Sequence, residues 1–136
     1  MTPTGPTGDV RSDVELRLPA DSAYVSVLRT TSAGLAARLD FTLDDIEDLR
    51  MAVGEASALV LPAASEGSDM TCHFYMDQGR LTVVVGVDSR NATSPDPDSF
   101  AWQVLTTLAG DASASVEGGR YEIALTMQSE TRDATG

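Results

Sequence analysis

Two runs of mostly apolar residues joined by a short polar turn constrain this chain's fold more than any other feature. Residues 70–76 and 81–87 are rich in aromatic and β-branched side chains, as strands are. The residues between them read Asp77-Gln78-Gly79-Arg80, and Gly79 can take the positive φ of a tight hairpin turn. The sequence therefore predicts two paired strands at the centre of the chain.

Further strands are predicted on both sides of this hairpin. Residues 14–18 alternate apolar and polar side chains with period two, which indicates a half-buried strand that ends at Pro19. Near the C-terminus, residues 113–116 and 121–127 should form a second hairpin that turns at Gly118-Gly119.

Capping residues predict where three helices begin. Asp21 or Ser22 can cap the first helix by accepting hydrogen bonds from its free N–H groups. Thr42, with Asp45 three residues later, resembles a capping box for the second helix, which Pro62 should end. Asp98 or Ser99 can cap the third. The side chains expected on the buried faces are Tyr24, Val27, Leu28, Thr31, Leu35 and Leu39, then Ile46, Leu49, Val53, Ala56 and Val60, then Phe100, Val104, Leu105 and Leu108.

The predicted order is strand, helix, helix, strand, strand, helix, strand, strand. This order favours an α+β fold: a two-layer sandwich of a mixed, mostly antiparallel sheet with helices on one face. The 136 residues suit one domain, expected at 13–128, between a disordered N-terminal tail at 1–12 and a flexible C-terminal tail at 129–136. No run is long enough for a membrane helix and no signal peptide is visible, so we expect a cytoplasmic protein.

The net charge is −12, and all nine basic residues are arginine. Such acidity disfavours direct binding to nucleic acid or to anionic membranes, because both need basic side chains. It suits a basic protein partner, and it equally well serves solubility alone. Cys72 is the sole cysteine, and its neighbour His73 should point to the opposite face of a strand, so we expect no metal site.

In the second helix, the run from Met51 to Leu61 consists of apolar and small residues except for one carboxylate, Glu55. This segment resembles the glutamate-bearing helix of the anti-sigma-factor kinases, the RsbW/SpoIIAB branch of the GHKL ATPase superfamily. In that family the helix reads E-x-x-x-N, where the glutamate activates the attacking group and the asparagine holds magnesium. Here Leu59 replaces the asparagine, and a hydrocarbon cannot ligate a hard cation.

The resemblance also implies positions for nucleotide binding. Asp88 stands where the family's D-x-G-x-G aspartate accepts a hydrogen bond from adenine, but Arg90 and Ala92 replace the two glycines. Ser99 replaces the glycine of a phosphate-binding turn. Glu55 is thus a vestigial general base in this interpretation. The expectation is no cofactor, with ATP and magnesium only if the chain is an active kinase.

The partner-binding elements implied by the resemblance are better retained. Arg29 matches an arginine of the first helix that contacts both the sigma factor and the anti-anti-sigma protein, a STAS domain. A homodimer is possible by the same analogy. We therefore expect an anti-sigma factor with weak or lost ATP binding. The alternatives are an active serine kinase acting on an anti-anti-sigma factor, or a regulatory domain whose pocket between sheet and helices takes a different small ligand.

Overall fold

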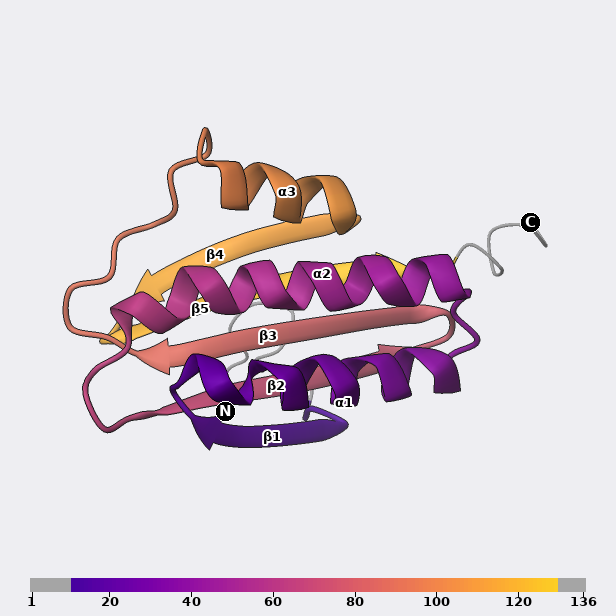
Figure 1. The fold of residues 1–136 in the computed structure, drawn as a ribbon, viewed down its shortest axis with the longest axis horizontal. Coiled ribbons are helices and arrows are strands. Elements are labelled where there is room, and N and C mark those ends of the chain that lie inside the picture. Colours follow the sequence, from indigo (N-terminus) through magenta and orange to yellow (C-terminus); the bar gives the residue numbers. More distant parts are fainter. Residues whose placement is uncertain (1–10, 130–136) are drawn as a thin grey trace.

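A five-stranded sheet lies behind a layer of helices in the computed structural model, which describes residues 11–129 (Figure 1). The strands are β1 (Val14–Pro19), β2 (Asp69–Asp77), β3 (Arg80–Asp88), β4 (Asp111–Glu117) and β5 (Arg120–Gln128). The α-helices are α1 (Val25–Arg38), α2 (Leu43–Val60) and α3 (Phe100–Leu108), and two short 3-10 turns are η1 (Ser22–Tyr24) and η2 (Leu61–Ala63). The predicted α+β arrangement with helices on one face is confirmed.

The strand order is β1-β2-β3-β5-β4, and every pairing among the described strands is antiparallel. We predicted a mixed, mostly antiparallel sheet, and the connection through α3 explains why the described strands form no parallel pair. This helix carries the chain back along the sheet, so β4 runs in the same direction as β3. The final strand β5 then inserts between them, antiparallel to both.

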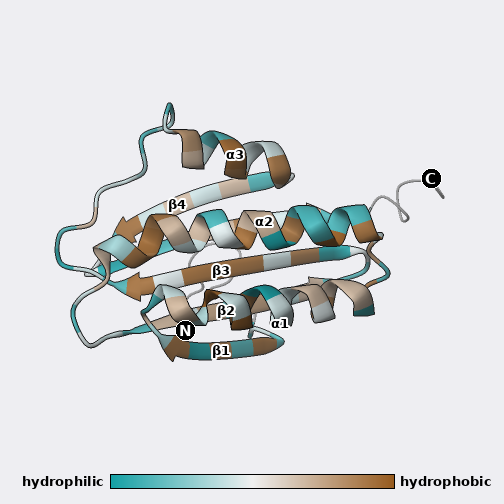
Figure 2. Cartoon of the chain, viewed as in Figure 1, coloured by the Kyte–Doolittle hydropathy of each residue, from teal (hydrophilic) through white to brown (hydrophobic). Residues whose placement is uncertain are grey.

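Alternate residues of the three central strands point toward the helices and form the core. Figure 2 shows β3, the middle strand, as hydrophobic along much of its length. Helices α1 and α2 cover these strands, and the open face of the sheet is more polar. The largest fully buried side chains are Phe74, Leu28, Leu49, Met70, Leu81, Leu105, Ile123, Leu125, Val53, Val60, Val83 and Val85.

Local signals in the sequence set most of the element ends. The Thr42 hydroxyl accepts a hydrogen bond from the Asp45 amide at 3.1 Å, which confirms the predicted cap of α2. Ser99 caps α3 in the same way, and Asp21 caps η1. Gly79 has a positive φ of 64°, as the hairpin requires. The predicted end of α2 is also close: the helix stops at Val60, before η2.

The buried face predicted for α3 is wrong in one important respect. Only Leu105 of this helix is fully buried, and Phe100 is 79% exposed. The helix packs mainly on α2 and only lightly on β4, the last strand of the sheet. In Figure 1 it lies beyond β4 rather than over the middle of the sheet, and Phe100 in its first turn is left exposed.

The predicted tails fall mostly at residues 1–10 and 130–136, outside the described part of the chain. At the inner ends of these segments, the Ser12 hydroxyl lies 3.2 Å from His73 Nδ1. Ser129 is buried, and its amide donates to the Gly79 carbonyl at 2.7 Å. No helix within residues 11–129 has both the length and the apolar character needed to cross a membrane.

Candidate functional site

Arg29 lies on α1 with its side chain directed across α2. A Cβ added to Gly54 of α2 would stand 2.6 Å from one terminal nitrogen of the Arg29 guanidinium, so the guanidinium occupies the space that glycine leaves open. Gly54 is buried, whereas Arg29 itself is exposed. The fold therefore supports the guanidinium from below and leaves its outer side accessible from solvent.

Glu55 and Leu59 follow Gly54 along α2, one helical turn apart. Both are half-buried, and Leu59 packs against the main hydrophobic core. We predicted that these two residues would lie away from the core stripe, and for Leu59 this separation is incomplete. The position of the family's magnesium-binding asparagine is thus occupied by an apolar side chain that contributes to core packing.

Asp88 ends β3, and an arginine from the neighbouring strand holds its carboxylate. Arg120 NH1 donates to Asp88 Oδ1 at 3.1 Å, and Arg120 Nε donates to Glu122 Oε2 at 3.4 Å. The other terminal nitrogen of Arg120 donates to the Thr71 hydroxyl on β2. Because Arg120, Glu122 and Thr71 all face the open side of the sheet, Asp88 is held on that side, away from the helices.

Gly86 makes this arrangement of side chains possible. A Cβ at this position of β3 would stand 2.8 Å from a terminal nitrogen of Arg120 and 2.8 Å from Cγ of Glu122. Only a residue without a side chain lets Arg120 cross β3 from β5 to Thr71 on β2.

The remaining positions implied for nucleotide binding are filled by local structure. The Ser99 hydroxyl accepts a hydrogen bond from the Trp102 amide at 3.2 Å and so serves as the cap of α3. Ala92, in the place of a glycine, and the half-buried Trp102 both pack against the main core. Among residues 11–129, the structure brings neither Glu55 nor Ser99 into contact with the Asp88 carboxylate.

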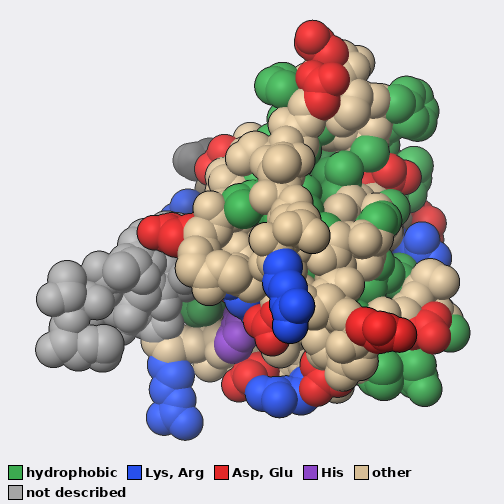
Figure 3. All heavy atoms as spheres, turned by 90° about the vertical axis from the view of Figure 1, so that its left-hand side faces the viewer, with side chains coloured by type: hydrophobic (Ala, Val, Ile, Leu, Met, Phe, Trp, Pro, Cys, Tyr) green, Lys and Arg blue, Asp and Glu red, His purple; other side chains and the backbone are tan. Residues whose placement is uncertain are grey.

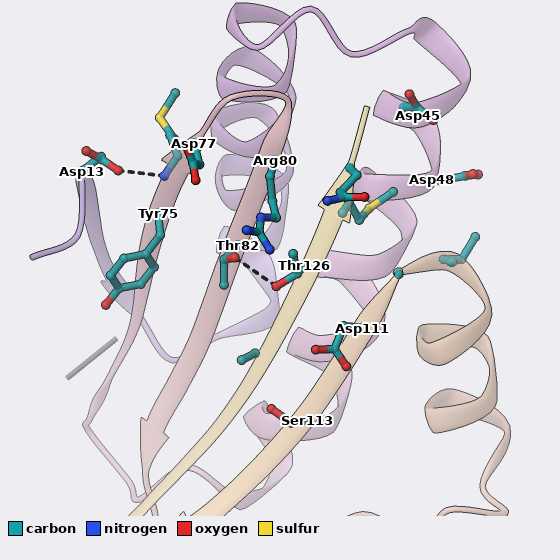
Figure 4. Close-up of a pocket in the computed structure, with 16 residues that line it drawn as sticks. Asp13, Asp45, Asp48, Tyr75, Asp77, Arg80, Thr82, Asp111, Ser113 and Thr126 are labelled. Carbon is teal, nitrogen blue, oxygen red and sulfur yellow. Dashed lines mark hydrogen bonds between the residues drawn. The ribbon is translucent and has the colours of Figure 1, made fainter. Parts of the chain in front are cut away.

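None of the predicted site residues Glu55, Leu59, Asp88 and Ser99 lines either of two surface hollows formed by residues 11–129. The first, of about 810 Å³, runs along one end of the sheet and includes Thr82 and Thr126, whose hydroxyls lie 2.9 Å apart (Figure 4). Asp111 and Ser113 of β4 also line it. The second, of about 640 Å³, lies between η2 and the residues that follow β3.

Magnesium and ATP therefore do not fit the residues present at the positions expected for them. Leu59 offers no oxygen ligand, the Asp88 carboxylate already accepts from Arg120, and the Ser99 hydroxyl is used in capping. Within residues 11–129, no group of three His, Cys, Asp or Glu side chains is placed to hold a metal ion.

The cysteine and histidine separate as predicted. Cys72 is fully buried in the core, and burial raises its pKa to about 12, although the charge of Arg120 acts in the opposite direction. His73 is half-buried on the other face of β2. The thiol is thus a packing group that stays protonated, not a nucleophile.

Sequence reasoning missed the three residues that explain this geometry: Arg120, Gly86 and Gly54. Glycines inside a strand or helix are a known signal of close approach, so Gly86 and Gly54 could have been singled out. Their contacts, however, come from residues more than 20 positions away, and only the fold reveals them. Nothing local marks Arg120 as the partner of Asp88.

The layered α+β arrangement, with Glu55 on the second helix and Asp88 at the end of β3, is consistent with a GHKL-like fold.

Curated proteins named serine-protein kinase RsbW resemble this chain in sequence. The protein from Halalkalibacterium halodurans is 39% identical over 88 residues, which is 64% of this chain and 52% of that protein. Those from Bacillus cereus (strain B4264) and Bacillus velezensis are 35% identical over 74 residues and 36% identical over 75 residues. These matches cover 54% and 53% of this chain, and 41% and 47% of the two proteins.

This chain is therefore a relative of the RsbW serine-protein kinases, and the predicted resemblance is confirmed over the matched residues. The chain spans about half the length of the curated relatives that it matches. No protein-family model matches it.

Proposed function

We propose that this protein is an anti-sigma factor that binds and sequesters an RNA polymerase sigma factor, and that an anti-anti-sigma partner releases it. The relationship to RsbW kinases supports this assignment. The observation that carries it is the Arg29 guanidinium, supported on Gly54 and exposed on the helix layer. The backbone of α2 at Gly54 limits the guanidinium on one side, and exposed arginines are frequent anchors of protein interfaces.

Weak or absent ATP binding is part of this proposal. Four features support it: Leu59 packs with the core, Ala92 and Trp102 do the same, Arg120 holds Asp88, and Ser99 caps α3. Binding of a nucleotide would require several of these contacts to break. The protein then acts by occupying its partner rather than by phosphorylating it.

The test is co-expression with each sigma factor of the source organism, followed by co-purification and measurement of the dissociation constant. The Arg29→Ala variant should bind the cognate sigma factor at least about tenfold more weakly. Arg17→Ala is the matched control, because Arg17 is an exposed arginine of β1 whose 3.8 Å ion pair with Asp69 lies on another surface. If no sigma factor co-purifies, or if both variants bind equally, the proposal is wrong.

Gly54→Ala separates the position of the guanidinium from its charge. The added methyl group displaces the flexible end of Arg29 without removing it, and alanine favours a helix over glycine by about 1 kcal/mol. We expect unchanged or raised thermal stability together with weakened sigma binding. A loss of stability that accounts for the loss of binding would remove this support for Arg29.

The main alternative is an active serine kinase, since the relatives are named as such. Calorimetric titration with magnesium and ATP distinguishes the two functions, and we expect no binding at submillimolar concentrations. Submillimolar binding that Glu55→Ala and Asp88→Ala both abolish would overturn the proposed loss of ATP binding and favour the kinase. Phosphate transfer to a co-expressed STAS-domain protein is the corresponding activity assay.

A further inference from the structure

The outer edge of β4 has no partner strand within residues 11–129. Backbone amide and carbonyl groups along such an edge can pair with a strand from another chain. Seven residues of β4 are available, which is enough length for a docked peptide of ordinary size.

The two edges of this sheet differ in how they are protected. On β1, the opposite edge, the charged Glu15 and Arg17 alternate along the strand and Pro19 ends it. Charged side chains and proline are the usual devices that prevent edge pairing. On β4 the five residues between the end carboxylates are small or apolar: Ala112, Ser113, Ala114, Ser115 and Val116.

Helix α3 lies beside this edge, on the helix side of the sheet. It extends beyond β4 in Figure 1 and packs mainly on α2. Phe100 is 79% exposed, and Val116 of β4 is 37% exposed. Figure 3 faces the end of the molecule where α3 begins, and at its top apolar side chains are exposed beside carboxylates. A strand added to β4 would place alternate side chains on the helix side of the sheet, next to α3 and to Val116.

The charges along the edge select among possible occupants. Asp111 and Glu117 lie at opposite ends of β4 and face the open side of the sheet, where Asp111 also lines the larger hollow (Figure 4). Antiparallel self-pairing centred on Ala114 would place Asp111 of one copy against Glu117 of the other, and like charges directly opposite are destabilising. The edge therefore disfavours a second copy and favours a segment that is basic at both ends.

We propose that the β4 edge and the underside of α3 form a docking site for an extended segment of a protein partner. The segment adds a sixth strand to the sheet. Its apolar side chains face α3, and its basic side chains face Asp111 and Glu117. This surface is separate from the Arg29 surface, so the inference goes beyond the proposed function and does not depend on it.

The probe is the acetylated and amidated peptide Arg-Val-Thr-Val-Thr-Val-Arg, whose two arginines match the spacing of Asp111 and Glu117. We expect binding by calorimetry, with amide chemical-shift changes confined to residues 111–117 and to α3 in nuclear magnetic resonance spectra. Replacing both arginines by glutamate should abolish binding, because like charges then meet. Replacing the central valine by proline should also abolish it, because proline disrupts strand pairing.

Variants of exposed residues locate the site without disturbing the fold. Asp111→Asn/Glu117→Gln should weaken peptide binding about three- to tenfold, as expected for two exposed ion pairs. Phe100→Ala should weaken it about tenfold through lost apolar contact. Leu43→Ala is the matched control, since Leu43 is 81% exposed at the start of α2, on another part of the surface.

Several outcomes would overturn the proposal: no binding of the arginine peptide, equal binding of the proline peptide, or shift changes away from β4. Concentration-dependent dimerisation that shifts the β4 amides would also overturn it, in favour of a second copy. Because the probe contains no sigma factor, failure here leaves the co-purification test of the Arg29 surface unaffected.

Discussion

Arg120 connects three strands through one side chain, and Gly86 leaves the space for it. We expect Gly86→Ala to lower the free energy of unfolding by about 1–3 kcal/mol, the usual effect of adding a methyl group to a packed site. The methyl group would meet both Arg120 and Glu122 at 2.8 Å, so the guanidinium must leave Thr71 and Asp88. Urea denaturation of the variant measures the change.

A double-mutant cycle tests the cause of that loss. In an Arg120→Ala background, Gly86→Ala should cost clearly less, because one of the two clashing side chains is gone. Additive effects of the two substitutions would show that Arg120 and Gly86 are not coupled as the geometry requires.

The buried thiol of Cys72 makes stability depend on alkaline pH. Burial raises its pKa from 9.0 to about 12, so between these values the unfolded chain loses a proton that the folded chain keeps. The unfolded state then binds fewer protons, and the free energy of unfolding falls as pH rises, by about 1.4 kcal/mol per pH unit from this group. Below about pH 9 the contribution is fully present.

Urea denaturation at about pH 8 and about pH 10 measures this slope. Cys72→Ala should be less stable at both values, because it leaves a cavity in the core, but its stability should fall less steeply with pH. Burial also raises the pKa of Tyr121, which acts in the same direction and remains in the variant. Equal slopes in the two proteins would contradict the assignment to Cys72.

At the level of elements, the cap of α2 is the local signal that can be tested most directly. Thr42→Ala removes the acceptor for the Asp45 amide and should lower the free energy of unfolding by about 1 kcal/mol. Thr93→Ala, in the exposed loop after β3, is the matched control and should change stability little. Thermal unfolding of both variants distinguishes a cap from a simple loss of hydroxyl.

The elements themselves could be predicted because their signals are local. A hydroxyl or carboxylate at the starts of η1, α2 and α3, a glycine in each hairpin, and apolar or alternating runs in the strands act within a few residues. The sequence also showed a resemblance to a known family, and the comparison with the RsbW proteins confirms that resemblance over 88 residues of this chain.

The predictions that failed depend on contacts between distant segments. The buried face of α3 was predicted from periodicity alone, and periodicity does not reveal that the sheet ends beneath the helix and leaves Phe100 exposed. The direction of the Asp88 carboxylate could not be predicted either. It depends on Arg120, which lies 32 residues later in the sequence.

At the level of the whole molecule, the excess of carboxylates should make stability depend on salt. The chain carries 21 acidic and nine basic residues, and the described ion pairs involve exposed partners. Mutual repulsion therefore outweighs pairing, and salt screens repulsion. We expect a higher melting temperature at about 500 mM than at about 20 mM sodium chloride. A fall in melting temperature would mean that the few ion pairs dominate.

The strand order also has a consequence for how the chain folds. The hairpins β2–β3 and β4–β5 each close over a two-residue turn, so they form early from neighbours in sequence. The pairing of β3 with β5 joins residues as far apart as Arg80 and Gln128, and the chain must close a long loop before it forms. The pairing of β3 with β5 should therefore be the late, rate-limiting step of folding. A chain cut in the loop after β3 should yield two fragments that reassociate through this pairing.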